Sequence, residues 1–198
     1  MPSPLFVHTG RAAPLRRSNV DTDQVIPAAF CKRLGRTGYA DTLFHAWRQQ
    51  PDFVLNQPRY AGASLLIAGP EFGIGSSREH AVWALRDSGF RVVIAPSFGD
   101  IFRNNAGKNQ LLTARVPRET VEALWELVEG DPALDVTADL EAREIRAGTL
   151  VVPFEIDDYT RWKLMQGLDD IEATLRYADQ IAAHERARPE WMPALERP

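Results

Sequence analysis

Cysteine is nearly absent from this 198-residue sequence, in which Cys31 is the only one. An internal disulfide is therefore excluded, and a reducing compartment such as the cytoplasm is expected. An iron–sulfur cluster is held by several cysteine thiolates, so one chain with one cysteine cannot hold such a cluster alone. Iron–sulfur chemistry would need a second chain.

Long apolar runs and a basic surplus are missing as well. No stretch approaches the roughly 20 apolar residues that cross a bilayer, so no membrane association is expected. Residues 1–4 have neither the charged start nor the apolar core of a signal peptide. The 23 basic and 27 acidic residues are interspersed and give a formal net charge of -4, which does not favour nucleic-acid binding.

What remains, 44% hydrophobic and 25% charged residues, is the composition of an ordinary globular protein. A chain of this length can bury one sizeable core, so we expect a single domain over residues 1–198. Residues 158 to about 198 follow a helical pattern and predict a C-terminal helical extension, with a break at Gly167.

The most informative stretch is residues 69–80, with the sequence G-P-E-F-G-I-G-S-S-R-E-H. An apolar run at 63–68 precedes it and predicts a buried strand, and 81–85 belongs to a predicted helix that Gly89 closes. The glycines between them allow positive φ and close approach to a ligand. The pattern thus predicts a strand, a glycine loop and a helix start.

This helix start carries side chains suited to an anion. Ser76 is predicted as the N-cap, because Glu79 follows at the spacing of a capping box. Unpaired N–H groups favour an anion there, and Arg78 adds a planar fork for a carboxylate or phosphate. A plain helix cap is the alternative, but the glycines, Ser77 and Arg78 in one turn favour a ligand site. The motifs of dinucleotide-binding folds, P-loops and serine hydrolases do not match.

Asp21 and Asp23 are separated by one residue amid turn formers. They could ligate a metal or serve as caps and Asx turns. No further acidic residue follows at regular spacing, so the structural role is favoured.

The rest of the chain predicts the sheet. An apolar run at 91–95 and a helical pattern at 100–106 repeat the central unit, which indicates parallel βαβ topology. Both helix starts are expected at the carboxyl edge of the sheet, where ligands bind. Residues 5–8 predict a short strand. Alternation over 134–156, with a turn at Gly148, predicts an antiparallel pair and hence a mixed sheet.

Three segments occur in order: N-V-D-T-D-Q at 19–24, F-G-I-G-S-S-R-E-H-A at 72–81 and I-A-P-S-F-G-D-I-F at 94–102, with G-L-D-D-I at 167–171 near the end. Together they resemble the small-subunit family of 3-isopropylmalate dehydratase, in the aconitase superfamily. The resemblance implies an α/β fold, a three-layer β/β/α swivelling domain whose mixed sheet contains a parallel βαβ unit.

The resemblance also implies a reaction and a partner. The chain would close over a large subunit that carries a [4Fe-4S] cluster, and would itself hold no cofactor or metal. Together they would convert 2-isopropylmalate to 3-isopropylmalate by dehydration and rehydration in leucine biosynthesis. The single Cys31 agrees with a cluster located on another chain.

By the same resemblance, Ser76 is the catalytic base and acts as an alkoxide. The helix start and Arg78 are what could lower the pKa of this hydroxyl. Arg78 would also bind a substrate carboxylate. Asp23 matches a Thr-Asp position at the edge of the family's active site, and Asp21 lies beside it; both are expected to order the site through hydrogen bonds.

Two loops are expected to contact the substrate. Gly75 and Ser77 belong to the glycine loop. Residues 30–38 occupy the place where members of the family read the γ-substituent of the substrate. An isopropyl group needs an apolar wall there, and Phe30 and Leu34 are the candidates, although the loop is basic in this chain.

Two positions depart from the family pattern, which often reads N-F-G-C-G. Ile74 replaces a cysteine that is not a cluster ligand, so activity is not threatened. Glu71 adds a negative charge near the site, for which the sequence offers no explanation.

Two alternatives remain open. A related small subunit acting on homoaconitate or a methylated malate would share these motifs. A binding module could use the same anion pocket for sensing or scaffolding, and it would bind a dicarboxylate unaided and without turnover.

Overall fold

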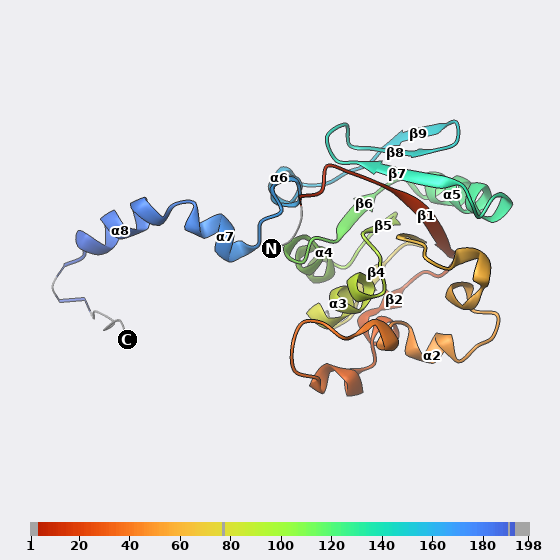
Figure 1. Cartoon of the computed structure of the whole chain (residues 1–198), viewed down its shortest axis with the longest axis horizontal. Coiled ribbons are helices and arrows are strands. Elements are labelled where there is room, and N and C mark those ends of the chain that lie inside the picture. The colour runs from red at the N-terminus through yellow and green to blue at the C-terminus, as the bar shows by residue number, and fades with distance from the viewer. Residues whose placement is uncertain (1–3, 77, 190, 193–198) are drawn as a thin grey trace.

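The computed structural model describes residues 4–76, 78–189, 191 and 192. Its centre is a seven-stranded mixed sheet with the order β6-β5-β3-β1-β7-β8-β9 (Figure 1). The strands are β1 (Val7–Leu15), β3 (Leu65–Ala68), β5 (Val92–Ala95), β6 (Leu112–Arg115), β7 (Asp135–Asp139), β8 (Glu144–Ala147) and β9 (Leu150–Pro153). Pairing is parallel from β6 to β1 and antiparallel from β1 to β9. The predicted mixed α/β fold with a parallel βαβ unit is confirmed.

β1 joins the two halves of the sheet. Its first five residues pair antiparallel with β7, and its last four pair parallel with β3. The short strand predicted at 5–8 was therefore wrong in its extent. Ala12, Ala13 and Leu15 are at most 1% exposed, and buried backbone in this position needs hydrogen-bond partners, which β3 supplies.

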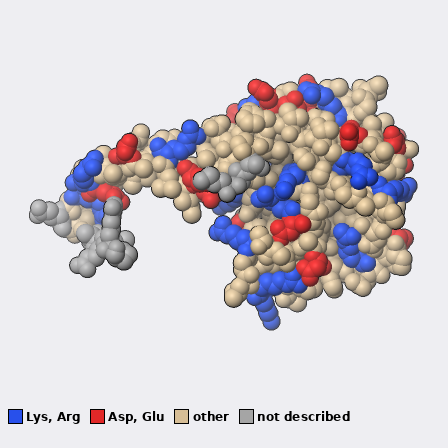
Figure 2. Space-filling view, viewed as in Figure 1, with Lys and Arg blue, Asp and Glu red and all other residues tan. Residues whose placement is uncertain are grey.

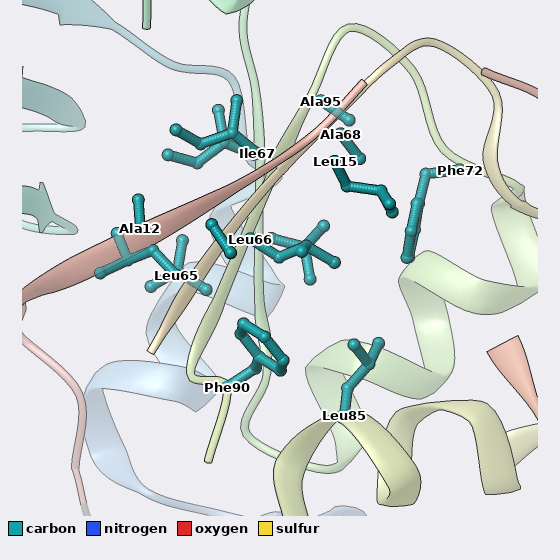
Figure 3. Close-up of a cluster of buried hydrophobic side chains, with 14 of the residues drawn as sticks. Ala12, Leu15, Leu65, Leu66, Ile67, Ala68, Phe72, Leu85, Phe90 and Ala95 are labelled. Atoms are coloured by element: carbon teal, nitrogen blue, oxygen red, sulfur yellow. The ribbon is translucent and has the colours of Figure 1, made fainter. Parts of the chain in front are cut away.

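Helices cover both sides of the parallel half. The helix α5 (Arg118–Gly130) lies on one side, and α3 (Glu79–Asp87) and α4 (Asp100–Lys108) lie on the other (Figure 1). Figure 3 shows the same division among the core side chains, with Leu66, Leu85 and Phe90 on one side of the strands and Ile67 on the other. Because β3 and β5 are buried on both faces, they read as continuous apolar runs in the sequence.

The short elements lie between β1 and β5. They are β2 (Val20–Asp21), α1 (Thr22–Val25), α2 (His45–Arg48), β4 (Phe72–Ile74) and the 3₁₀ turns η1 (Ala28–Lys32), η2 (Ala40–Thr42), η3 (Val54–Asn56) and η4 (Pro58–Tyr60). β2 and β4 form a separate two-stranded parallel ribbon. This ribbon was not predicted, and it positions the candidate site.

The C-terminal helices are α6 (Asp158–Gln166), α7 (Asp170–Leu175) and α8 (Ala178–Arg186). They confirm the predicted helical pattern, and Gly167 ends α6 with a left-handed φ of 65°. Figure 1 shows α7 and α8 extending away from the rest of the chain. An ion pair between Lys163 and Asp170 holds the start of α7, whereas α8 has no buried residue.

Basic and acidic side chains are interspersed over the face seen in Figure 2, as the composition indicated. Within the described part of the chain, no helix is both long and apolar enough to cross a membrane.

Candidate active site

The ribbon of β2 and β4 brings two separate motifs together. Val20 lies beside Phe72, and Asp21 lies beside Ile74. This register carries Asp21 against the glycine loop: a Cβ added at Gly75 would lie 3.4 Å from the Cβ of Asp21. Residues about 50 positions apart in the sequence therefore form one site.

The glycine loop is shaped by close backbone contacts. Gly73 and Gly75 have φ values of 76° and 87°, a region that favours glycine. A Cβ at Gly73 would lie 2.7 Å from that of Phe102, on α4. A Cβ at Gly99, just before α4, would overlap the carbonyl oxygen of Gly73 and lie 3.0 Å from its carbon. The turn before α4 and the glycine loop thus lie in direct contact.

Glu71 gains a structural role at the same junction. Its backbone N–H donates to Ser97 Oγ at 2.9 Å, and that hydroxyl donates to Glu71 Oε1 at 2.6 Å. The backbone of Glu71 has a φ of 60°, so the reciprocal pair holds a strained residue. The carboxylate fastens the glycine loop to the end of β5. Sequence reasoning missed Ser97 because its partner is 26 residues away.

The predicted capping box is wrong. The helix α3 begins at Glu79, so its N-cap is Arg78, and that side chain makes no capping hydrogen bond. The chain needs the residues after Gly75 to turn from β4 into the helix, which places Ser76 outside it. Glu79 is engaged elsewhere, since its Oε1 accepts from Asn109 Nδ2 at 2.6 Å.

Ser76 is exposed on the turn between β4 and α3, and Arg78 stands at the start of α3. The guanidinium of Arg78 forms an ion pair with Asp23, on α1. The hydrogen bond that Arg78 donates to the Asp23 carboxylate raises the pKa of Arg78, and Cys31 makes a smaller contribution in the same direction. The structure therefore brings Asp23, Arg78 and Cys31 together at the start of α3, two residues along the chain from Ser76. Cys31 was not predicted here, because no local pattern marks it.

Asp21 is a helix cap, as the sequence favoured. Its Oδ1 accepts from the N–H of Gln24 at 2.7 Å, while Gln24 Oε1 accepts from the N–H of Asp21 at 2.9 Å. This reciprocal box starts α1 and orients Asp23 on its first turn. No group of three or more His, Cys, Asp or Glu side chains that could hold a metal occurs among the described residues.

The loop at residues 30–38 is folded around Tyr39. The buried Tyr39 hydroxyl lies 3.1 Å from the carbonyl oxygen of Arg33 and 3.0 Å from that of Gly35, to which it donates. Arg33 in turn forms a bidentate pair with Asp41 at 2.7 Å. Tyr39 thus sets the path of this loop. Sequence reasoning missed this role, because a single tyrosine after a glycine is not a recognisable motif.

The two candidates for an apolar wall differ in their surroundings. Phe30 is partly buried against the core and lies 4.9 Å from the ring of His45, measured between centroids. Leu34 is 97% exposed. The role of these two residues as the wall stays a prediction. Ser77 lies outside the described residues.

The arrangement is an open, charged surface. Asp23 retains 54% of its side-chain exposure and Arg78 retains 28%, while Ser76 and Gly75 are exposed. An exposed hydroxyl beside a held guanidinium can bind a carboxylate and present an oxygen to an adjacent carbon. The surface is too open to exclude water, so closing it requires a further surface.

Known proteins resemble the chain over nearly its whole length. The family model described as the aconitase C-terminal domain matches residues 3–119. A model described as LeuD_N matches 122–158, and a model for the C-terminal domain of the 3-isopropylmalate dehydratase small subunit matches 170–197.

Curated relatives and a solved structure agree with the family models. The 3-isopropylmalate dehydratase small subunit of Acidothermus cellulolyticus is 66% identical over 190 residues, covering 96% of each chain. That of Thermobifida fusca is 60% identical over 96% of this chain and 97% of its own. The crystal structure of 3-isopropylmalate dehydratase from Methanocaldococcus jannaschii superimposes with a TM-score of 0.67 at 25% identity, covering 91% of this chain and 99% of that one. The chain belongs to the 3-isopropylmalate dehydratase small-subunit family.

Proposed function

We propose that this chain is the small subunit of a 3-isopropylmalate dehydratase. With a large subunit it converts 2-isopropylmalate to 3-isopropylmalate by removing and re-adding water, as a step of leucine biosynthesis. The observation that carries the proposal is the surface where the pair of Arg78 and Asp23 lies beside the exposed Ser76, within a chain that belongs to this family.

Each side chain then has a chemical task. Dehydration next to a carboxylate needs a base for the carbon-bound proton and a cation for the carboxylate. Ser76 acts as an alkoxide, so its Oγ takes the carbon-bound proton to become a hydroxyl and returns the proton on rehydration. Asp23 holds one edge of the Arg78 guanidinium, which has five N–H donors, so donors remain for a substrate carboxylate. Asp21 orients Asp23 by capping α1.

The loops supply the remaining contacts. Gly75 presents backbone to the substrate, and Ser77, two residues later in the same loop, donates a hydrogen bond to it. Phe30 and Leu34 form the wall for the isopropyl group. The 97% exposure of Leu34 suits a residue that is covered only when substrate and large subunit are present.

The [4Fe-4S] cluster is assigned to the large subunit. One cysteine does not provide a cluster's ligands, and the described residues hold no group of three side chains suited to a metal. The residues of this chain do not fit the cluster, so the cluster's part in the reaction is left to the partner. We further propose that residues 1–198 act as one domain with an extension from about 158, and that the chain works in the cytoplasm, for which its single cysteine is the argument.

The test is reconstitution with the cluster-bearing large subunit. The chain alone should be colourless and inactive, and the mixture should interconvert the two isopropylmalates. Ser76→Ala should lower kcat by at least about 1,000-fold, with KM little changed, because it removes the base. Ser88→Ala, at the other end of α3, is the matched control and should keep normal turnover.

Three outcomes would contradict parts of the proposal. Near-normal turnover of Ser76→Ala would remove the base assignment. Faster turnover of homoaconitate or a methylated malate would change the substrate. Tight binding of isopropylmalate by the isolated chain, without turnover in the mixture, would indicate a binding module instead.

A further inference from the structure

A charged cavity, separate from the candidate active site, lies between the 30–38 loop, the ends of α3 and α4 and the start of α7. It has a volume of about 540 Å³. Its lining is mainly polar and basic, with Arg36, Thr37, Trp83, Arg86, Asp87, Arg91, Lys108, Asn109 and Asp169. Four cationic side chains meet two carboxylates there. The cavity contains none of the residues assigned to the reaction.

Ordinary structural roles explain only two of the four cations. Arg86 and Lys108 lie in the last turns of α3 and α4, where a positive charge complements the helix dipole. Lys108 also pairs with Asp170 at 3.5 Å. Arg36 belongs to the exposed loop, and Arg91 stands just before β5. Neither guanidinium has a hydrogen-bond or ion-pair partner in the described part of the chain.

The two carboxylates are already engaged. Asp87 Oδ2 accepts from the N–H of Tyr39 at 2.9 Å, and Asp169 Oδ1 accepts from the N–H of Glu172 at 2.7 Å. These hydrogen bonds stabilise the end of a loop and the start of a helix. Two carboxylates offset only two of the four positive charges that line the cavity. Four cations and two carboxylates give the lining a formal excess of two positive charges, one of which is offset by the pair between Lys108 and Asp170.

Arg86 is the cavity residue whose pKa reflects both burial and the neighbouring positive charge. Its Nη1 donates to the carbonyl oxygen of Asn109 at 2.6 Å, but its Nε is buried without a hydrogen-bond partner among the described residues. Burial lowers the pKa of Arg86, and the charge of Arg91 lowers it further. Arg86 and Arg91 both line the cavity, so an anion bound there would relieve the repulsion between their guanidinium groups.

We propose that this cavity binds a phosphate group. The cations come from four separate elements, namely the loop, α3, the start of β5 and α4. A phosphate has acceptor oxygens in a tetrahedral arrangement and can meet such donors, whereas a planar carboxylate presents two oxygens in one plane. The cavity is larger than one phosphate, so it also has room for the rest of a phosphorylated molecule.

A phosphate bound in this cavity would connect the 30–38 loop with α3, two elements next to the candidate active site. Arg36 lies on the loop that carries Leu34, and Arg86 lies on the helix that begins next to Arg78. A phosphate held by Arg36 and Arg86 would tie the loop to α3. The inference does not rest on the proposed activity, because binding needs neither the large subunit nor substrate.

The test is calorimetric titration of the full-length chain with inorganic phosphate at pH 8 and constant ionic strength. We expect saturable binding with a Kd in the millimolar range or tighter, roughly the strength of a few charged hydrogen bonds. Arg91→Gln and Arg36→Gln should each weaken binding by about tenfold. Arg118→Gln is the matched control, because Arg118 pairs with Glu122 on the far helix α5, and should bind as the parent does.

The alternatives give distinct results. No saturable binding, or an equal Kd in all four proteins, would overturn the site. Tighter binding of malonate than of phosphate would overturn the choice of ligand. Because Arg36 is exposed, Arg36→Gln remains a valid test if Arg91→Gln fails to fold. Titration with glycerol phosphate then distinguishes a phosphorylated molecule from free phosphate, since only the former gains affinity from the remaining space.

Discussion

The contact between Gly99 and Gly73 gives a sharp test of how the site is held. Gly99 has a φ of −60°, which alanine adopts easily, so backbone strain does not enter. Its added Cβ would overlap the carbonyl oxygen of Gly73, which is backbone and cannot rotate away. Gly99→Ala must therefore push the turn before α4 away from the glycine loop.

The expected cost has two parts. Overpacking against a fixed group costs about 1–3 kcal/mol. Gly99 is also the N-cap of α4, where alanine is poorer than glycine by roughly 0.5–1 kcal/mol. Together these give about 1.5–4 kcal/mol. For a chain of this length each kcal/mol lowers Tm by roughly 2–4 °C, so we expect a decrease of about 3–16 °C.

Gly130→Ala is the matched control. Gly130 ends α5 and is exposed, and a Cβ there would meet nothing within 4 Å. Alanine should leave stability unchanged or raise it by up to about 1 kcal/mol. Thermal melts of both variants measure the difference, and turnover of the reconstituted enzyme should fall only for Gly99→Ala. Equal melting temperatures for the two variants would refute the contact.

Three further predictions follow from other parts of the chain. Tyr39→Phe removes the hydroxyl that holds the 30–38 loop, which should lower the free energy of unfolding by about 1–1.5 kcal/mol and raise KM more than it lowers kcat. The control Tyr159→Phe, at an exposed ring, should change neither kinetic constant. The N–H of Ala142 donates to the Asp139 carboxylate and holds its pKa below the ordinary value, so the ionised carboxyl stabilises the fold at neutral pH. This contribution is lost as pH falls below about 4. In denaturant titrations, the difference in unfolding free energy between the parent and Asp139→Asn should therefore shrink from pH 7 to pH 3. Deleting residues 177–198 removes α8, which buries nothing, and should shift Tm by less than about 2 °C in thermal melts.

The parts of the fold that sequence reasoning predicted are those where burial is continuous. β3 and β5 are buried at every position, and α5 has a clear apolar face, so local pattern was enough. β1 was underestimated because its outer half alternates with polar residues around Gly10. Residues 12–15, the half of β1 that pairs with β3, have no alternating sequence pattern and were therefore predicted as a loop.

The site was predictable in its residues but not in its contacts. Asp23 and Arg78 came from motifs, yet their ion pair depends on the ribbon of β2 and β4. That ribbon is too short to leave a periodic signal, since β4 has three residues and one is Gly73. Tyr39 and Ser97 act through partners that only the tertiary fold supplies.

The corrected start of α3 removes a conflict in the proposed chemistry. A serine that caps a helix is held by the helix N–H groups, and a serine that acts as base must be free to reach a carbon-bound proton. Because α3 begins at Glu79, Ser76 has no capping duty. The same shift puts Arg78 at the N-cap, where Asp23 fixes its guanidinium. In the proposed mechanism, the clamp Arg78 is thus ordered before substrate binds, whereas the proposed base Ser76 stays exposed. That division suits a half-site whose other surface arrives with the large subunit, because the charge that positions substrate is already in place when the two chains meet.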